Sequence, residues 1–251
     1  MAKRYELSDA QWDRIAHLLP GKLGDRGRSG RDNRLFVNGV LWVLRSGARW
    51  EDLPERYGKW KTTHKRFTRW AKAGVWERVF DSLTSDLDSQ YLMLDTTLVR
   101  VHQQAAAGKG GPKNQAVGRS RGGLTTKIHT LTDAQGRPLR FILTGGEAHD
   151  STTAADLLVG QAPAGVIADK AYDSNALREL IAEAGAEAVI PSIPSRKIVI
   201  PHDRLAYRLR NRIERFFNKL KHFRHVATRY DRRAAYFLAA LHLASAMIWM
   251  S

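Results

Sequence analysis

The stretch YLMLDTTLVRV, residues 91–101, determines the predicted fold of this chain. Residues 91–94 are apolar, and Val99 and Val101 continue the alternating pattern of a β-strand. Asp95 interrupts the apolar run, where an ionised carboxylate is costly unless it is paired or binds a metal ion. The stretch therefore predicts a buried strand with a candidate functional carboxylate in its middle.

The residues before this strand carry helical patterns. Ser8 and Gln11 have the spacing of a capping box, and residues 33–45 place apolar side chains at helical intervals. A further helix is predicted over residues 62–72. We therefore expect residues 1–88 to form an all-helical N-terminal domain.

The residues after this strand alternate between strand and helix patterns, which predicts an α/β domain over residues 89–251 with a mixed sheet covered by helices. Strands are expected at 91–101, 127–131, 139–143, 166–169 and 188–190, and helices at 150–159, 174–184, 204–223 and 233–250. Residues 105–123 are rich in glycine and cations, and we expect them to form a mobile loop that orders on binding a partner.

Composition narrows the class of protein. The chain has 251 residues, a net charge of +16 and no cysteine. The charge favours a polyanionic partner, and the missing thiols exclude disulfides, a thiol nucleophile and thiolate zinc sites. Residues 234–250 are the most apolar stretch, but they are fewer than the about 20 that span a bilayer. We expect a buried C-terminal helix, no membrane partner and a cytoplasmic protein.

The helix expected over residues 205–221 has three faces. The apolar face, expected to pack on the sheet, contains Leu205, Leu209, Ile213, Phe216 and Leu220. The second face is wholly basic and contains Arg208, Arg212, Arg215 and Lys219. The third contains Tyr207, Arg210, Glu214 and Lys221. The basic face is either solvated or bound to an anionic partner, and repulsion among like charges favours the partner.

Three carboxylates form a candidate site, although each has a simpler interpretation. Glu214 is either a metal ligand or the partner of Arg210 in a surface ion pair at i,i+4. Asp95 and Asp169 are either ligands or hydrogen-bonded structural carboxylates. Asp169 follows a predicted strand at the edge where sites gather in α/β sheets. Phosphodiester chemistry requires carboxylates that hold divalent cations. The histidines show no convincing zinc pattern, and His222 and His225 are expected at the surface or facing DNA.

Several motifs together resemble the bacterial DDE transposases, in particular the "insertion sequence five" family within the "insertion sequence four" superfamily. The spacing Tyr-x2-Arg-x3-Glu-x6-Lys of Tyr207, Arg210, Glu214 and Lys221 matches that superfamily's signature. The other matching segments are DTT at 95–97, GRSRGGLTTKIH at 118–129, DKAYD at 169–173 and FVNGVLWVLRSGARWEDLP at 36–54. The resemblance covers nearly the whole chain.

This resemblance implies an RNase H-like mixed sheet flanked by helices, with Asp95, Asp169 and Glu214 as catalytic metal ligands. It implies two Mg²⁺ ions, for which Mn²⁺ can substitute, and DNA strand cleavage followed by strand transfer through a 3′-hydroxyl. It also implies that Tyr207, Arg210 and Lys221 contact DNA. The partners would be double-stranded DNA, as element ends and as target, and a second copy of the chain in a homodimer on DNA, associated with the bacterial nucleoid.

Further DNA contacts are expected outside the carboxylate site. The predicted helix 62–72, with Lys65, Arg66 and Arg69, is either a recognition helix for the element ends or a basic solvent-facing helix. Arg119, Arg121 and Lys127, in or next to the basic segment 105–123, are expected to follow the DNA backbone.

Two other functions use the same features. A related nuclease would cleave DNA without strand transfer, and a transposase-derived regulator would bind DNA without cleaving it. The three carboxylates favour an enzyme over the regulator. The sequence of the terminal repeats, the target preference and the second-strand pathway do not follow from the chain alone.

Overall fold

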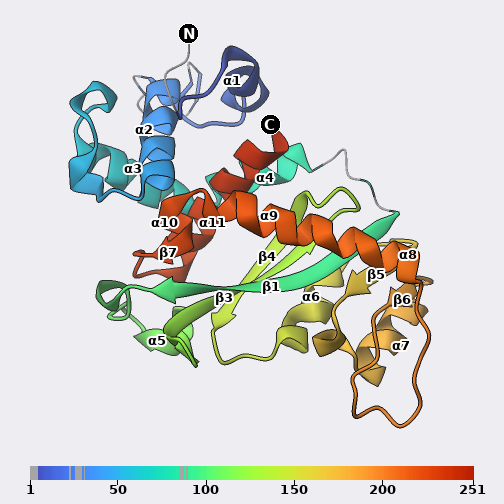
Figure 1. Cartoon of the computed structure of the whole chain (residues 1–251). Coiled ribbons are helices and arrows are strands. Elements are labelled where there is room, and N and C mark those ends of the chain that lie inside the picture. Colours follow the sequence, from blue (N-terminus) through green and yellow to red (C-terminus); the bar gives the residue numbers. More distant parts are fainter. Residues whose placement is uncertain (1–4, 23, 26–29, 31, 85–87, 89) are drawn as a thin grey trace.

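The protein is described by a computed structural model that covers residues 5–22, 24–25, 30, 32–84, 88 and 90–251. Figure 1 shows one mixed β-sheet with helices on both faces and a group of helices from the N-terminal part packed at one end. The predicted domain boundary between residues 88 and 89 adjoins residues 85–87 and 89, which lie outside the described residues.

The sheet is built around β1, its central strand. In the described residues it has seven strands: β1 (Tyr91–Val101), β2 (Gly118–Ser120), β3 (Gly123–Thr132), β4 (Pro138–Gly145), β5 (Gly165–Ala168), β6 (Glu187–Val189) and β7 (Thr228–Arg229). On one side β1 pairs antiparallel with β3, which pairs antiparallel with β4 and β2. On the other side β1 pairs parallel with β5, and β5 pairs parallel with β6. This is the mixed sheet that the sequence predicts.

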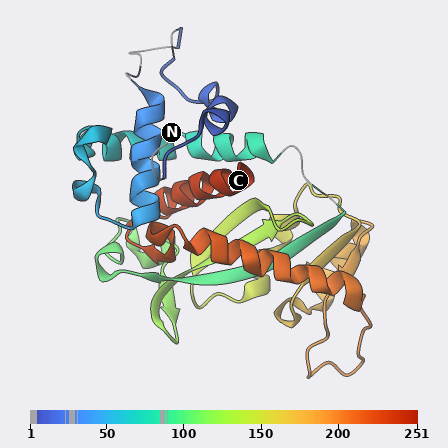
Figure 2. The ribbon, with the colours of Figure 1, turned by 45° about the horizontal axis from the view of Figure 1, so that its top comes forward.

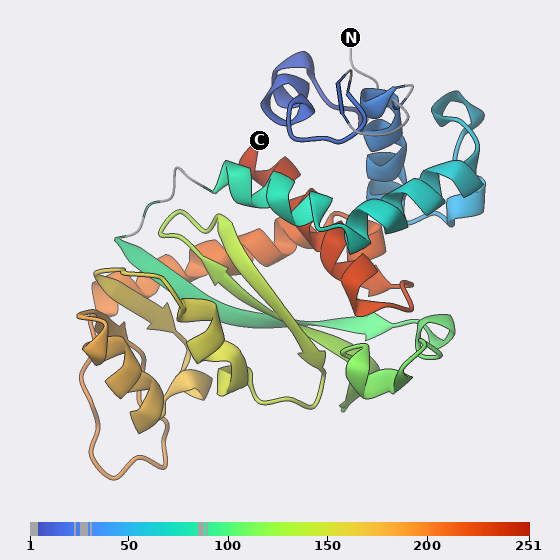
Figure 3. The same ribbon diagram turned by 180° about the vertical axis from the view of Figure 1, so that it is seen from behind.

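Helices cover both faces of the sheet and form the N-terminal part. They are α1 (Asp9–Ala16), α2 (Asn33–Ser46), α3 (Trp60–Lys72), α4 (Val75–Leu83), α5 (Gly111–Asn114), α6 (Ala154–Leu158), α7 (Asn175–Glu183), α8 (Arg204–Tyr207), α9 (Asn211–Lys221), α10 (Arg224–Ala227) and α11 (Ala234–Trp249). Short 3-10 turns lie at Trp50–Asp52, Glu55–Tyr57, Gln103–Ala105, Asp150–Thr153, Lys170–Tyr172 and Arg208–Arg210. Figure 1 shows α9 across the near face of the sheet, and Figure 3, seen from behind, shows α6 and α7 on the other face.

Alternation along β1 determines which side chains face α9. Leu92 and Leu94 enter the apolar cluster formed with α6 and α7, whereas Met93 and Val99 enter the larger cluster that contains the apolar residues of α9 and α11. Because successive side chains of a strand point to opposite faces, Asp95 shares the face of Met93. The carboxylate of β1 is therefore on the α9 side of the sheet.

The C-terminal helix α11 joins the N-terminal helices to the sheet (Figure 2). It is apolar on all sides, as expected of a helix buried in a core. Its residues share one hydrophobic cluster with Val37 of α2, Trp70 of α3 and Val79 of α4. The predicted buried C-terminal helix is confirmed, and α2, α3 and α4 share its hydrophobic cluster, although Val43, Leu53 and Tyr57 form a smaller cluster of their own in the N-terminal part.

Two local predictions were wrong. The segment 105–123 is not one irregular loop, because it contains α5 and the edge strand β2, which pairs with β3. The predicted helix 204–223 is interrupted by the 3-10 turn Arg208–Arg210 between α8 and α9. Leu205, expected to pack on the sheet, is 73% exposed as a result of lying on α8 beyond this turn. Among the described residues, no helix has the length and apolar character needed to cross a membrane.

Candidate active site

The two aspartates of the candidate site lie on neighbouring parallel strands. Leu94 of β1 is in register with Ala168 of β5, so that Asp95 and Asp169 occupy the next position of each chain segment. Adjacent strands lie about 4.8 Å apart, which brings the two carboxylates into one neighbourhood. Asp169 lies directly after β5, and its side chain accepts a hydrogen bond from the Ala171 N–H at 2.8 Å. It therefore caps the 3-10 turn Lys170–Tyr172, as expected of an aspartate at the end of a strand.

Glu214 reaches the same neighbourhood from α9, and Arg210 connects it to the strand. Arg210 donates from Nη1 to Oε1 of Glu214 at 2.6 Å and from Nη2 to Oδ2 of Asp95 at 2.8 Å. The guanidinium therefore bridges two of the three predicted ligands. The 3-10 turn that ends at Arg210 and the first turn of α9 place both residues over β1.

The electrostatics of Asp95 reflect burial among like charges. Burial raises the pKa of Asp95 to about 6, although Arg210 and the Thr96 N–H lower it, and the nearby charges of Asp169 and Glu214 raise it further. Burial lowers the pKa of Arg210, but Asp95 and the neighbouring acids outweigh burial and raise it. The guanidinium is therefore held in its charged form as the counter-ion of the acidic group.

Two tyrosines border the carboxylates. Burial raises the pKa of Tyr207, and among the smaller influences Arg210 lowers it while Asp169 and Asp95 raise it, which places Tyr207 beside the site. Tyr172 is buried near the carboxylates. Burial, together with the charge of Asp95, raises the pKa of the Tyr172 hydroxyl. The Tyr172 hydroxyl has no hydrogen-bond partner in the described part of the chain. Tyr172 was quoted in the DKAYD motif, but nothing in the pattern indicated its position below the carboxylates.

The donor set fits a hard divalent cation. Asp95, Asp169 and Glu214 offer carboxylate oxygens, the ligand type that Mg²⁺ prefers. Within the described residues, no group of three or more acidic or histidine side chains is already arranged to hold a metal ion. Arg210 supplies the positive charge between Asp95 and Glu214 instead. The three carboxylates are chemically suited to a divalent cation, and Arg210 lies between two of them.

The cations of the basic face lie on exposed parts of α9 and the turn before it. Arg208, Arg215 and Lys219 are exposed, and Arg212 is half-buried because it donates a hydrogen bond to the Ala134 carbonyl. Lys221, the last residue of the signature, is exposed at the end of α9. These positions leave four of the five cations open to solvent.

Lys127 does not lie where the sequence-based prediction put it. It is 9% exposed, and its Nζ pairs with the Asp150 carboxylate at 2.5 Å and bonds the Ala148 carbonyl. The prediction of a DNA contact was wrong for this residue, because the ammonium is used inside the protein. Arg119 and Arg121, near β2, are exposed as expected.

The cations of the proposed recognition helix differ in their surroundings. Lys65 and Arg69 are exposed on α3, but the guanidinium of Arg66 stacks over the rings of Phe36 and Trp70 at 4.3 and 4.6 Å. It also donates a hydrogen bond to Asn33. Arg66 is thus a packing residue in this structure, contrary to its assignment as a DNA contact.

The two histidines after α9 have opposite environments. His222 is exposed, as predicted. His225, also predicted to lie at the surface, is 4% exposed, and its Nε2 lies 3.4 Å from the Asp231 carboxylate. The i,i+3 spacing gave no sign that α10 turns back into the core after α9.

Comparison with known proteins identifies the family. The family described as "Transposase DDE domain" matches residues 87–249, and the family described as "Putative transposase of IS4/5 family" matches residues 7–80. The chain is 44% identical over 129 residues to the "Putative transposase for insertion sequence element IS6501" of Brucella ovis, which covers 51% of this chain and 99% of that protein.

A second curated relative and a solved structure are also similar to parts of the chain. The chain is 32% identical over 151 residues to the "Putative transposase for insertion sequence element IS402" of Burkholderia cepacia, covering 55% of this chain and 69% of that protein. A solved structure titled "Mos1 transposase paired-end complex with left transposon end" aligns with a TM-score of 0.27 and 10% identity, over 84% of this chain and 85% of that one. The chain therefore belongs to the transposase DDE domain family of metal-dependent polynucleotidyl transferases, as an insertion-sequence transposase of the IS4/IS5 type.

Proposed function

We propose that this transposase binds the terminal inverted repeats of its element, cleaves there and joins the freed 3′-hydroxyl to target DNA. The observation that supports the proposal is that Arg210 bridges Asp95 of β1 and Glu214 of α9, while the register of β1 with β5 places Asp169 beside Asp95. Asp95, Asp169 and Glu214 are the proposed catalytic residues, and they would hold two Mg²⁺ ions, or Mn²⁺ in their place. The bound ions would activate an attacking oxygen and stabilise the leaving one.

The chain's own residues prepare this site for a phosphodiester. Asp95 is buried on a rigid central strand, which keeps its carboxylate fixed and poorly hydrated. Arg210 neutralises the acidic group until a metal and DNA arrive, and its guanidinium then turns to a DNA phosphate, for which the planar fork of arginine is suited. Tyr207 stands next to Arg210 and positions DNA rather than acting as a nucleophile, since in-line attack by water or a 3′-hydroxyl needs no covalent protein intermediate.

The proposed DNA surface extends from the carboxylates along α9 and onto α3. Exposed cations along these elements are suited to phosphate contacts: Lys221, Arg208, Arg215, Lys219, Lys65, Arg69, Arg119 and Arg121. Arg212 can contribute through the part of its guanidinium not bonded to Ala134. The helical residues 1–88 are the proposed end-binding region, and two copies of the chain would hold the two element ends as a homodimer on bacterial DNA in the cytoplasm.

The experiment is a cleavage assay with the full chain. The substrate is a duplex that carries the inverted repeats flanking the gene, and Mg²⁺ is added after purification in EDTA. Asp95→Asn, Asp169→Asn and Glu214→Gln should each abolish cleavage and leave DNA binding intact. Glu183→Gln, an equally conservative change at an exposed position of α7, is the control and should cleave normally.

The outcomes separate the proposed functions. Full cleavage by any of the three variants would remove that residue from the site. Cleavage by the wild-type chain without joined products on a target plasmid would assign a nuclease rather than a strand-transferring transposase. DNA binding without any Mg²⁺- or Mn²⁺-dependent nicking would assign a regulator.

A further inference from the structure

The hydroxyl of Tyr172 is buried beside the proposed metal ligands without a partner of its own. Tyr172 is 1% exposed, and its hydroxyl forms no hydrogen bond with any residue that the structure describes. An unpaired hydroxyl in a protein interior lowers stability, and such groups are few in folded proteins. A phenylalanine ring would fill the same space without this cost. The hydroxyl is therefore a candidate for a contact with a bound group.

The ring of Tyr172 is packed against the two strands that lead to the aspartates. It shares a hydrophobic cluster with Leu94 of β1 and Ala168 of β5, the residues that directly precede Asp95 and Asp169. Residues of α7 belong to the same cluster, so that Tyr172 lies on the α7 side of the sheet. The pairing of β1 with β5 ends at Leu94 and Ala168. Beyond this pair the sheet is open beside Asp95, which leaves a path from the ring to the carboxylates.

The turn that carries Tyr172 is held at both ends. The Tyr172 N–H donates to the Asp169 carbonyl at 3.1 Å and closes the 3-10 turn Lys170–Tyr172. The next residue, Asp173, has a fully buried side chain that pairs with Arg178 and Arg196, each at 2.8 Å. These contacts fix the backbone on either side of Tyr172. The position of the hydroxyl relative to Asp169 is therefore set by the backbone as well as by packing of the ring.

The hydroxyl lies within the influence of several charges. Burial raises the pKa of Tyr172, and the charges of Asp95, Asp150 and Asp169 raise it further, whereas Arg210 lowers it. The hydroxyl therefore stays protonated and neutral at physiological pH. It can donate one hydrogen bond and accept others.

The acidic groups near the hydroxyl have other partners. The two oxygens of Asp95 accept hydrogen bonds from the Thr96 N–H and from Arg210, each at 2.8 Å. Asp150 is paired with Lys127 at 2.5 Å. Polar groups that are near each other but beyond direct hydrogen-bond distance commonly interact through a molecule between them. The hydroxyl is thus placed to act on the carboxylate site through an intervening group.

We infer that the Tyr172 hydroxyl forms a hydrogen bond with a water ligand of the cation held by Asp95 and Asp169. Tyr172 is then a positioning residue of the metal site, and it touches neither DNA nor the reacting atoms. Mg²⁺ on protein carboxylates keeps several of its waters, and hydrogen bonds from outside the ligand shell orient what the ion holds. The inference rests on the proposed function, because it takes the two aspartates as metal ligands.

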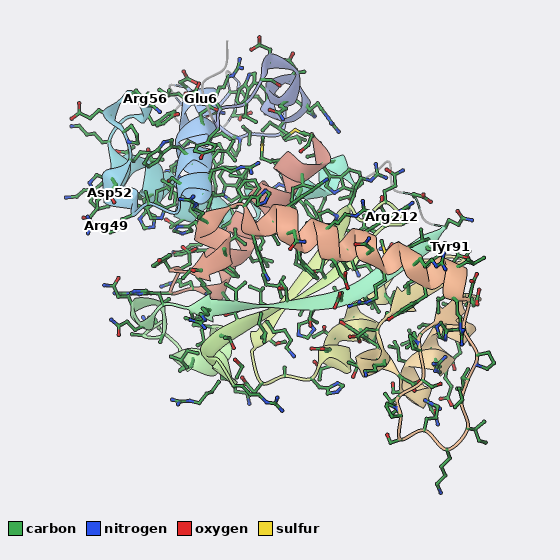
Figure 4. The ribbon with its side chains drawn as sticks, viewed as in Figure 1. Glu6, Arg49, Asp52, Arg56, Tyr91 and Arg212 are labelled. Carbon is green, nitrogen blue, oxygen red and sulfur yellow. The ribbon has the colours of Figure 1, made fainter. Side chains whose placement is uncertain are left out.

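The first test compares two Tyr→Phe variants of the full chain. Tyr172→Phe removes the unpaired hydroxyl, whereas Tyr57→Phe removes a buried hydroxyl that donates to Glu6 at 2.8 Å. Figure 4 shows Glu6 among the N-terminal helices, away from β1, so that Tyr57→Phe is a matched control far from the carboxylates. Isothermal titration calorimetry measures the Mg²⁺ affinity of each variant, and thermal unfolding in EDTA measures its Tm.

The two variants should differ in opposite ways. Tyr172→Phe should bind Mg²⁺ about tenfold more weakly than the wild-type chain, without a lower Tm in EDTA. Tyr57→Phe should have a lower Tm and an unchanged Mg²⁺ affinity, because it loses a hydrogen bond within the protein. Unchanged Mg²⁺ affinity in Tyr172→Phe would overturn the inference. A Tm lowered as far as that of Tyr57→Phe would also overturn it, because the hydroxyl would then have a partner in the metal-free chain.

The second test observes the ring of Tyr172 directly. The chain has seven tyrosines, and labelling with 3-fluorotyrosine gives each a ¹⁹F NMR resonance. The resonance of Tyr172 is assigned as the one that Tyr172→Phe lacks, and that of Tyr57 in the same way. On titration with Mg²⁺ the Tyr172 resonance should move and the Tyr57 resonance should not. A Tyr172 resonance that stays in place at saturating Mg²⁺ would overturn the inference.

Asp169→Asn separates the failure of this inference from that of the proposed function. Mg²⁺ binding that is weakened by Asp169→Asn but not by Tyr172→Phe would remove the role of Tyr172 and keep the metal site. Mg²⁺ binding that Asp169→Asn leaves unchanged would place the ion elsewhere, and it would remove the proposed site together with the inference.

Discussion

Arg210 donates to Asp95 at 2.8 Å across 115 positions of sequence, and through its other terminal nitrogen it holds Glu214 at 2.6 Å. The ion pair between Arg210 and Glu214 is therefore part of the proposed catalytic site, because the same guanidinium also binds Asp95. The ion-pair interpretation of Glu214 is confirmed, and its role as a metal ligand stays a prediction. We expect this guanidinium to compete with a divalent cation for the two carboxylates that it contacts.

Replacing Arg210 should strengthen metal binding in the absence of DNA. Arg210→Gln removes the competing charge, and because a charged hydrogen bond contributes about 1.5–3 kcal/mol, the affinity for Mg²⁺ should rise about tenfold or more. Isothermal titration calorimetry measures this directly. In EDTA the variant should also melt at a lower temperature, because three acidic side chains lose their counter-ion. Arg204→Gln, at an exposed arginine of α8, is the control. An unchanged or weaker Mg²⁺ affinity in Arg210→Gln would contradict the competition.

The cations of α3 should separate into DNA contacts and a packing residue. Lys65→Ala and Arg69→Ala should each change the free energy of unfolding by less than about 0.5 kcal/mol, as exposed substitutions do, and each should lower the salt slope of DNA binding by about one unit. Arg66→Ala should destabilise the fold by about 1–2 kcal/mol, because the guanidinium stacks on Phe36 and Trp70. Urea unfolding and fluorescence anisotropy measure the two quantities. The reverse pattern would show that Arg66 is the DNA contact.

Asp173 should make stability depend on pH between about 4 and 2. Burial alone raises the pKa of Asp173, but hydrogen bonds from Arg196, the Ile193 N–H and Arg178 outweigh it and lower the pKa from 3.8 to about 2. The stabilisation is therefore complete above pH 4 and is lost as the pH falls through 2. Asp173→Asn should remove this part of the pH dependence and destabilise the chain by about 3–5 kcal/mol near pH 7.

The control for Asp173 is a surface ion pair. Asp9→Asn breaks the pair with Arg34, in which the Asp9 side chain is 89% exposed. Such pairs contribute about 0–1 kcal/mol. Denaturant unfolding at a series of pH values compares the two variants, and an Asp173→Asn curve parallel to that of the wild-type chain would refute the assignment.

Much of the fold follows from periodicity in the sequence. The apolar pattern along residues 91–101 predicts the strand that becomes β1, with Asp95 in its middle. Ser8 and Ser174 cap α1 and α7 as their positions predict. These features depend on neighbours within a few residues, and local patterns record such neighbours faithfully.

The wrong predictions concern partners that are distant in the sequence. In the sequence, Lys127 cannot be distinguished from the other cations near the basic segment. Its ion pair with Asp150 forms only in the folded chain. Arg66 has a helical position equivalent to that of exposed cations, but Phe36 lies beneath it. Leu205 completes an apolar stripe only if the helix runs without interruption, and the 3-10 turn at Arg208–Arg210 breaks that geometry. Tertiary contacts decided the cases of Lys127 and Arg66, and a local break in the helix decided that of Leu205.

In the candidate site, too, local sequence patterns predicted some features and contacts between distant residues determined others. Asp95, Asp169 and Glu214 are recognisable from a motif and from their places on predicted elements. Their shared counter-ion is not, because the contact of Arg210 with Asp95 depends on how α9 crosses β1.

The central claim is that Asp95, Asp169 and Glu214 together hold the divalent cations that act on DNA. Anomalous X-ray diffraction from crystals of the full chain with duplex DNA and Mn²⁺ tests it most directly, because it locates the ions. We predict Mn²⁺ between these three carboxylates, with Arg210 withdrawn from Asp95 and in contact with a DNA phosphate. Mn²⁺ bound elsewhere, with Arg210 still bridging Asp95 and Glu214, would contradict the account.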